Sequence, residues 1–198
     1  MRDRVIRDEI HRDILVPAHH ARIIDTHEFQ RLRNVQQLST CEFVFPSATH
    51  TRFAHSLGAY HLAGALTDSL QEVQPGLLSN DDAELVRLGA LLHDIGHPPY
   101  SHLLETPEVF ATYHSHEHWG RVMLEDTSSE IGQVLDEVLG MERKKRLFSI
   151  LDGASECDGV PIAPFLKEII SSQLDVDRMD YMIRDQANTG AQIGGFDS

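Results

Sequence analysis

Cysteine is scarce in this sequence, and long apolar runs are absent. The two cysteines, Cys41 and Cys157, are far apart in the chain and provide neither a disulfide framework nor a zinc knuckle. No apolar run is long enough to span a bilayer, and the charged start at residues 1–4 lacks the apolar region of a signal peptide. We therefore expect a cytoplasmic protein, in a reducing compartment, without membrane association.

Basic residues are also few. The chain has 17 Lys and Arg against 31 Asp and Glu, which gives a formal net charge of −14. This balance disfavours extended binding to a nucleic-acid backbone, although a metal and a few local cations would suffice to hold a small polyphosphate. The sequence also contains no internal repeat, no glycine-rich phosphate loop and no nucleophile elbow.

Histidine, in contrast, is abundant, with 13 in 198 residues. Three of them, together with Asp94, lie within the ten residues from His93 to His102. The length allows one domain with a sizeable core, and the 41% of hydrophobic and 24% of charged residues are ordinary for such a domain. The histidine clusters therefore favour metal chemistry over a general compositional bias.

A helix is predicted to lead into this cluster. Asp81 with Glu84 three residues later has the pattern of an N-cap and capping box. Pro98 and Pro99 cannot continue the helix, so we expect it to end near residues 96–97. Its buried stripe would consist of Leu85, Leu88, Leu92 and Ile95.

His93, Asp94 and His97 stand at the end of this predicted helix. His93 and His97 are four residues apart and share a face, and an adjacent His-Asp pair can give a divalent metal one nitrogen and one oxygen. An isolated His-Asp pair is more often a solvated helix end. The neighbouring histidines favour the metal, whose other ligands must come from elsewhere in the chain.

The segments before this helix give two further predictions. Residues 1–24 indicate a short extended segment or hairpin, with His19 and His20 on a solvated turn. Residues 25–35 indicate a helix that Asp25 or Thr26 would cap. Its buried side chains would be Phe29, Leu32 and Val35.

A longer helix is predicted from about residue 49 to Val73. Arg52 and His55 are three residues apart, so they point to about the same side. A metal ligand with a phosphate-pairing arginine beside it is chemically sensible, although His55 alone is more often a satisfied histidine at a helix start. The predicted core stripe consists of Ala59, Leu62, Leu66, Leu70 and Val73.

The C-terminal half gives three helical patterns. One begins near residue 114 with Val122 and Met123 inward, and the basic run 142–146 indicates a solvated helix face. The last begins near Pro164 and continues past residue 174. Its predicted stripe is Phe165, Ile169, Ile170 and Leu174. Its continuation places Asp177, Asp180, Tyr181 and Arg184 on one face, so that a carboxylate among them is a candidate metal ligand.

His55, His93-Asp94 and Asp177 together complete the pattern H…HD…D. The chain resembles the HD-domain metal-dependent phosphohydrolases, and among them the deoxynucleoside triphosphate triphosphohydrolases, including the enzymes that join a SAM domain to an HD domain. The similarity extends over essentially the whole chain. The segments that carry it, in order, are Ile24–Thr26, Phe29–Arg33, Gln37–Leu38, Phe45–Pro46, Thr51–Phe53, His55–Gly58, His93–His97, Ser101–His102, His116–Glu117 and Asp175–Tyr181.

The resemblance implies an all-α fold, an HD-domain helical bundle around a single metal site, with a short N-terminal hairpin. Residues 1–198 would form a single HD domain that is truncated on its C-terminal side, because family members continue well beyond the last Asp helix. The metal ligands would be His55, His93, Asp94 and Asp177. Mixed nitrogen and oxygen ligation suits one iron, manganese or zinc ion, with magnesium at a second position.

The resemblance also implies catalytic residues. His102 would be the general acid for the departing sugar oxygen, and Glu105 would orient it. His97 and His116 would line the phosphate site.

The implied substrate contacts come from both halves of the chain. Arg52 and Arg178 would neutralise phosphate charge, although the family often has Lys where Arg178 stands. Gln37 and Asp185 would hold the sugar 3′-hydroxyl, and Tyr181 would pack under the sugar.

Asp25, Gln30 and Arg33 match a regulatory guanine-nucleotide contact in some family members. The expected activity is hydrolysis of a dNTP to deoxynucleoside and inorganic triphosphate by a homo-oligomer. Two alternatives remain open: an HD phosphohydrolase that acts on another nucleotide or phosphoester, and a nucleotide-binding module without turnover.

Overall fold

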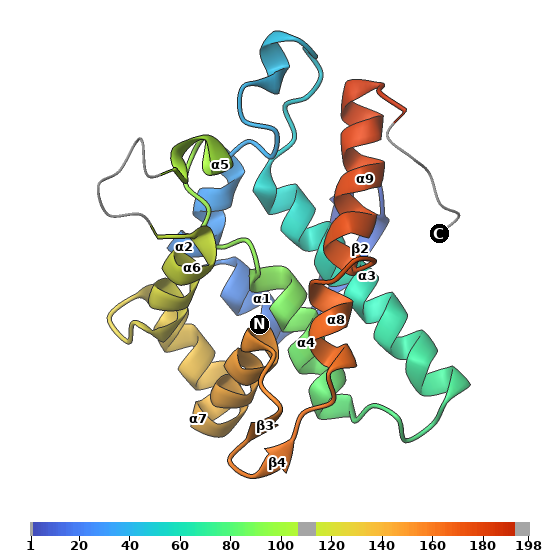
Figure 1. The fold of residues 1–198 in the computed structure, drawn as a ribbon, viewed down its shortest axis with the longest axis vertical. Helices are drawn as coiled ribbons and strands as arrows, with labels where there is room; N and C mark the ends of the chain where they lie inside the picture. The colour runs from blue at the N-terminus through green and yellow to red at the C-terminus, as the bar shows by residue number, and fades with distance from the viewer. Residues whose placement is uncertain (1, 107–113, 193–198) are drawn as a thin grey trace.

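Two helices, α3 (Arg52–Val73) and α4 (Asn80–Leu92), form the centre of the computed structural model, and α9 (Val176–Thr189) packs along α3 (Figure 1). The structure describes residues 2–106 and 114–192, apart from the side chains of Ser101 and His102. The facing sides of α3 and α4 are apolar. Tyr60, Leu85 and Leu88 are fully buried between them and their neighbours. The predicted all-α fold is confirmed.

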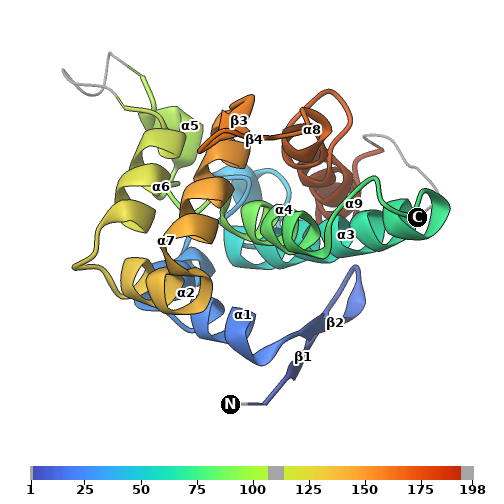
Figure 2. The same ribbon diagram turned by 90° about the horizontal axis from the view of Figure 1, so that it is seen from below.

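Shorter helices surround this centre. They are α1 (Ala18–Ile24), α2 (His27–Gln30), α5 (Ser101–Leu104), α6 (His116–Glu125) and α8 (Phe165–Ile170), with short 3-10 helices at Arg31–Asn34 and Cys41–Phe43. The long helix α7 (Glu130–Asp152) contacts α1, α2, α4, α6 and α8, so it joins the N-terminal helices to the centre (Figure 2). None of the helices in the described part of the chain combines the length and apolarity needed to cross a membrane.

The predicted N-terminal hairpin is present. Strands β1 (Arg4–Asp8) and β2 (Arg12–Val16) pair antiparallel, with Ile6 opposite Ile14. Ile14 is fully buried, and β2 lies against α3 (Figure 2). A second small hairpin, β3 (Glu156–Cys157) with β4 (Val160–Pro161), follows α7.

Side-chain caps set where the central helices begin. Thr51 accepts from the backbone N–H of Ala54 at the start of α3, and Ser79 accepts from that of Asp82 at the start of α4. The prediction that Asp81 caps α4 is therefore wrong. Asp81 lies instead in the first turn, where its charge complements the helix dipole.

The end of α4 also differs from the prediction. Regular α-helix stops at Leu92, and i→i+3 hydrogen bonds continue the chain as tight turns to His97. Gly96 lies in these turns against α6. A Cβ atom there would come 1.9 Å from the carbonyl oxygen of His116 and 2.3 Å from the backbone nitrogen of Gly120. Because no side chain fits this approach, Gly96 fixes the position of His93 to His97 against α6.

Three side chains predicted to be inward are exposed. Val73, at the last turn of α3, is 81% exposed, and Val122, in α6, is 44% exposed. Leu174 is 71% exposed because α8 ends at Ile170 and α9 starts anew after Asp175, so the stripe does not continue. Asp175 makes this break by accepting from the backbone N–H groups of Ser172 and Arg178.

Two predictions of solvated polar side chains are also wrong. His20 lies in α1 rather than on a turn, and it is buried. Lys144 lies in the basic run but is buried, because α7 kinks at Gly140 and folds back on itself. Its Nζ binds the carboxylate of Asp136 at 2.7 Å.

Candidate metal centre

Three segments that are far apart in the sequence meet at one point. α3 contributes His55, the turn after α4 contributes His93 and Asp94, and the first turn of α9 contributes Asp177. Nε2 of His55 lies 3.0 Å from Oδ1 of Asp177 and 3.6 Å from Oδ2 of Asp94. Nε2 of His93 lies 3.3 Å from Oδ1 of Asp94 and 3.6 Å from Oδ1 of Asp177. The structure thus brings together the four ligands predicted from the sequence.

These distances fit a shared metal ion. Two ligand atoms about 2.1 Å from one ion are about 3.0–3.4 Å apart at octahedral or tetrahedral angles. The Nε2 atoms of His55 and His93 are buried and have no well-aligned hydrogen-bond partner among the described residues. Buried polar atoms without a partner are costly, and a cation between the two rings and the two carboxylates would satisfy both.

The other nitrogen of each ring is already engaged. Nδ1 of His93 contacts the carbonyl oxygen of Ala90 at 2.8 Å, so it must carry the proton. Nδ1 of His55 lies 2.8 Å from Oδ2 of Asp180. Such contacts fix the tautomer that leaves the Nε2 lone pair free for a metal.

Asp180 is the hub of a buried network behind His55. It accepts from Nε of Arg184 at 2.8 Å, and its Oδ1 lies 2.7 Å from Nε2 of His11. Arg184 in turn donates to Asp8, which closes the network on the N-terminal hairpin. Gly58 allows the approach, because a Cβ there would lie 1.8 Å from Oδ1 of Asp180.

The sequence does not predict this network, although it includes Asp180 among the candidate carboxylate ligands on its helix face. Asp180 and Arg184 were placed on one face of a helix, and their i,i+4 spacing is the signal that indicated a pair. The participation of His11 and Asp8 had no such signal, because they come from a hairpin about 170 residues away in the chain.

The electrostatics of the centre favour a cation. Burial alone lowers the pKa of His55, but the adjacent carboxylates of Asp177 and Asp180 outweigh it and raise the pKa to about 10. Burial alone raises the pKa of Asp177, but His55 and His93 hold it well below the usual range. An environment that stabilises a proton on a fully buried imidazole also stabilises a metal ion in that position.

Asp94 connects the centre to the arginine predicted to bind phosphate. Arg52 donates to Oδ2 of Asp94 at 2.5 Å, and both side chains are buried. Burial alone raises the pKa of Asp94, but the charge of His93, a hydrogen bond from His97 and the charge of Arg52 lower it well below its usual value. Asp94 is therefore ionised, as a ligand must be.

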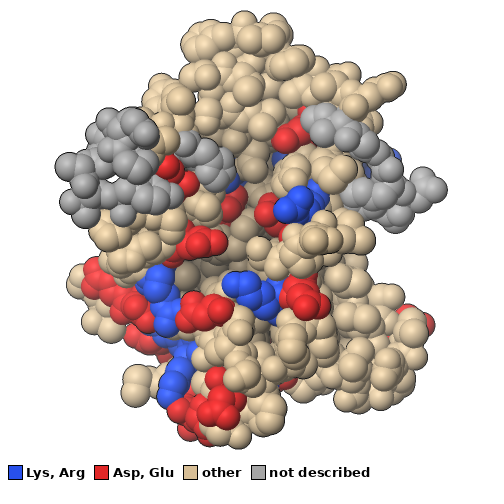
Figure 3. Space-filling view, viewed as in Figure 1, with Lys and Arg blue, Asp and Glu red and all other residues tan. Residues whose placement is uncertain are grey.

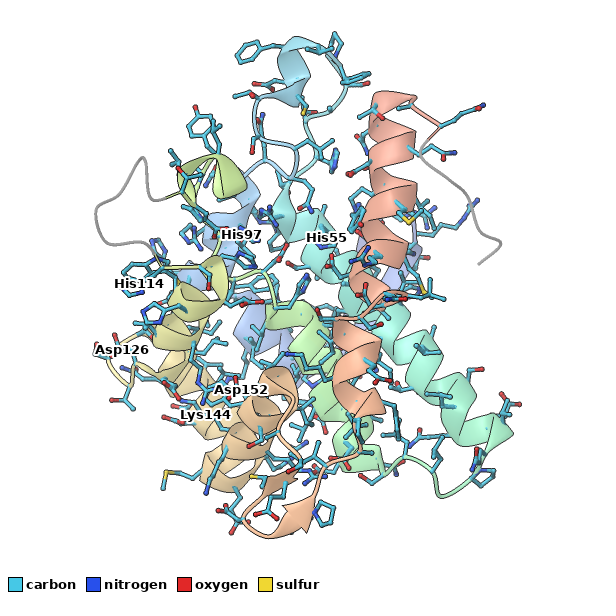
Figure 4. The ribbon with its side chains drawn as sticks, viewed as in Figure 1. His55, His97, His114, Asp126, Lys144 and Asp152 are labelled. Carbon is cyan, nitrogen blue, oxygen red and sulfur yellow. The ribbon has the colours of Figure 1, made fainter. Side chains whose placement is uncertain are left out.

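His97 and His116 lie on the other side of Asp94. Their rings stack with centroids 3.7 Å apart, and Nε2 of His97 is 3.3 Å from Oδ1 of Asp94. Figure 4 shows His55 and His97 on opposite sides of the space between α3 and α6. Burial lowers the pKa of His97 to about 4, so its ring is neutral at pH 7. Asp94, His97 and His116 also offer three closely spaced ligand atoms.

Glu105 contacts this pair from the end of α5. It accepts from the backbone N–H of His116 at 2.7 Å, and its Oε1 is 3.0 Å from Nδ1 of the same residue. The predicted partner of Glu105 is His102, whose backbone lies in α5 but whose side chain is outside the described part of the structure. The orientation of His102 by Glu105 therefore stays a prediction.

A cavity of about 400 Å³ opens beside the centre. His93, Asp94 and Asp177 line one side of it, and the cations Arg121 and Lys167 line another. Figure 3 shows acidic and basic side chains around a hollow in the face that Figure 1 presents. The cavity is large enough for a nucleotide-sized ligand.

The predicted sugar contacts Gln37 and Asp185 both lie next to His50. The backbone N–H of Gln37 donates to the carbonyl oxygen of His50, and Nε2 of His50 is 2.7 Å from Oδ1 of Asp185. Oε1 of Gln37 is buried without a hydrogen-bond partner in the described part of the chain. Tyr181 follows Asp180 in α9, and Arg178 donates to the carbonyl oxygen of Ser172.

The residues predicted to contact a regulatory nucleotide form contacts within the chain. Asp25 accepts two hydrogen bonds from Arg4, at 2.6 and 2.5 Å. Gln30 accepts from Arg33 at 2.7 Å, and the guanidinium of Arg33 lies 3.6 Å from the ring centroid of Phe53. These contacts do not involve a nucleotide, and they do not prevent one from binding.

The chain is similar to proteins from all three branches of life. It is 39% identical over 194 residues to an uncharacterised protein of Methanocaldococcus jannaschii, covering 98% of this chain and 36% of that protein. It is 37% identical over 214 residues to the human deoxynucleoside triphosphate triphosphohydrolase SAMHD1, covering 96% of this chain and 34% of that protein. The chain therefore spans about a third of the length of these relatives.

A solved structure agrees with the fold. The crystal structure of a hypothetical protein from Aquifex aeolicus superposes with a TM-score of 0.79 at 37% identity, covering 98% of this chain and 49% of that one. The HD domain family model matches residues 52–185, which include all four predicted metal ligands. The chain belongs to the HD domain family.

Proposed function

We propose that this protein is a metal-dependent phosphohydrolase that cleaves a dNTP into deoxynucleoside and inorganic triphosphate. The observation that carries the proposal is the convergence of His55, His93, Asp94 and Asp177, with two buried Nε2 atoms among them that have no well-aligned hydrogen-bond partner in the described residues. The similarity to SAMHD1 supports the choice of substrate. One iron, manganese or zinc ion fits the mixed ligands, and magnesium fits a second position.

A divalent ion in this centre supplies Lewis-acid activation of a phosphoryl oxygen and of water. The chain's own residues would position the substrate around it. Arg52 is held by Asp94 and carries a fixed positive charge at the edge of the centre, where a phosphate oxygen would be bound. His97 and His116, stacked and backed by Glu105, would line the phosphate site.

The departing group in this reaction is the sugar 5′-oxygen, which leaves as a strong base and needs a proton. We assign that proton to His102, because histidine titrates in the useful range and α5 ends next to the His97–His116 pair. Gln37 and Asp185 would bind the 3′-hydroxyl. The unpartnered Oε1 of Gln37 supports this role, because a hydroxyl could donate to it.

Product analysis tests the proposal. The purified protein, loaded with manganese or iron, should convert dNTP to deoxynucleoside and triphosphate in a one-to-one ratio. Release of orthophosphate would favour the alternative phosphohydrolase, which acts on another phosphoester. Nucleotide binding without any product would favour a binding module.

A further inference from the structure

A second cluster of metal-binding side chains lies away from the HD centre, where α1 meets the start of α4. Nε2 of His19 is 2.9 Å, and Nε2 of His20 is 3.0 Å, from the same oxygen, Oε1 of Glu84. Glu84 is nine residues before His93, which corresponds to about 14 Å along the helix. The proposed hydrolysis uses none of these three side chains.

We propose that His19, His20 and Glu84 form a second divalent-metal site, of the three-ligand type that suits zinc. The three ligand atoms all lie within 4.8 Å of one another. Ligands bound to zinc at about 2.1 Å with tetrahedral angles are about 3.4 Å apart. Each imidazole would therefore move only about 0.4 Å from the carboxylate oxygen to admit the ion.

Burial and a contact with Tyr60 fix the orientation of the His20 ring, as is usual for a histidine that binds a metal. Its side chain is 2% exposed, and Nδ1 lies 2.7 Å from the hydroxyl of Tyr60. With a metal bound, the proton would be on Nδ1 and would be donated to Tyr60, which would leave the Nε2 lone pair for the ion.

Glu84 is held in a similar way. Its second oxygen, Oε2, accepts from Arg143 at 2.8 Å, which leaves Oε1 for the ion. Arg143 is itself paired with Asp81 at 2.6 Å and adds little repulsion.

The open side of the cluster is at His19. Its side chain is 50% exposed, so an ion can enter and a water can occupy the fourth position. The guanidinium of Arg87, which lies 4.5 Å from the ring centroid of Tyr60, remains as an opposing charge. With three protein ligands and this repulsion, we expect weaker binding here than at the four-ligand centre.

A metal in this position would link α1 to α4 and so stabilise the folded chain. An ion that binds only the native state raises the melting temperature in proportion to the logarithm of its concentration. The competing interpretation is a hydrogen-bonded cluster in which Glu84 accepts from both rings and no ion binds.

The test counts zinc equivalents after equilibrium dialysis, by elemental analysis, and follows the melting temperature as zinc is added. The His19→Ala protein should bind one zinc equivalent fewer than the wild type. It should also lose the rise in melting temperature that this zinc ion causes. His27→Ala removes an exposed histidine on α2 and should behave as wild type. Tyr60→Phe should keep the fold and weaken this site roughly 10- to 100-fold, as loss of an orienting partner does.

Two further variants separate this site from the HD centre. The His93→Ala protein should still bind the zinc equivalent that the His19→Ala protein loses, whatever the HD centre binds. Glu84→Gln, which preserves the size of the side chain, should lose the same equivalent as His19→Ala. Unchanged zinc stoichiometry in both His19→Ala and Glu84→Gln would overturn the proposal.

Discussion

At the scale of single residues, the proposed metal ligands are held in place by groups outside the proposed ligand set. Asp180 holds Nδ1 of His55 and also pairs with Arg184 and His11, all within hydrogen-bond distance. The resemblance to the HD-domain phosphohydrolases predicts the four ligands, because the sequence contains the pattern H…HD…D. It could not predict this supporting network, because the contacts form only when the hairpin and α9 are brought together.

Asp180→Asn should weaken metal binding. The amide keeps the size of the carboxylate but loses its charge and one acceptor oxygen, so it cannot serve His55, His11 and Arg184 together. We expect metal affinity to fall roughly 10- to 100-fold. Metal titration monitored by competition with a chelator measures this, with exposed Asp68→Asn as the control for the charge change. Equal affinity in both variants would show that the network does not support the centre.

His102→Ala tests the assignment of the general acid. The variant should retain metal and substrate binding but lose turnover by roughly 10²–10⁴-fold, the usual contribution of general acid catalysis. Steady-state rates, metal content and nucleotide binding together separate the outcomes. Loss of metal would make His102 a ligand, and an unchanged rate would remove it from the mechanism.

At the scale of helices and turns, the tight turns after α4 position the site. The sequence predicted a helix end at the two prolines, but it could not show that α-helix stops at Leu92 and that i→i+3 turns continue to His97. Arg31 secures these turns by donating to the carbonyl oxygens of Ile95 and His97. Tertiary contacts thus override the simple helical periodicity at the residues proposed to bind the metal.

Gly96→Ala should disturb both stability and metal binding. The added methyl group meets backbone atoms of α6 that cannot move aside, and such overpacking costs about 1–3 kcal/mol. For a chain of this length the melting temperature should fall by about 2–4 °C per kcal/mol. In the control Gly89→Ala the nearest atom is the mobile Cδ1 of Ile170. If Gly96→Ala matched that control in melting temperature and metal content, the close packing of the turns on α6 would not matter.

At the scale of the whole molecule, the helical architecture and the hairpin followed from periodicity and family resemblance. The predictions that were wrong concern single side chains, and each has a physical reason. His20 was expected on the surface but is buried against Tyr60, and Leu174 was expected inside but is exposed at a helix break. Periodicity locates a stripe within one helix, but it cannot report where a polar side chain finds a buried partner or where a cap ends the helix.

The arrangement of Gln37 and Asp185 around His50 predicts how the molecule selects its substrate. If these side chains bind the 3′-hydroxyl, a 2′,3′-dideoxy nucleotide leaves them buried and unpaired, which strongly disfavours its turnover. The kcat/KM for a dideoxy NTP should therefore be far below that for the matching dNTP. Gln37→Ala should reduce this preference, and equal turnover of both nucleotides in the wild type would contradict the assignment.

The metal content of two ligand variants tests the proposed centre most directly. His93→Ala removes a proposed ligand from the turn after α4, and Asp177→Ala removes one from α9, and the two ligand atoms are 3.6 Å apart. Elemental analysis at fixed free manganese, with folding checked by circular dichroism, should show loss of the tightly bound ion in both variants. His27→Ala should retain it. Full occupancy of folded His93→Ala and Asp177→Ala proteins would contradict the centre described above.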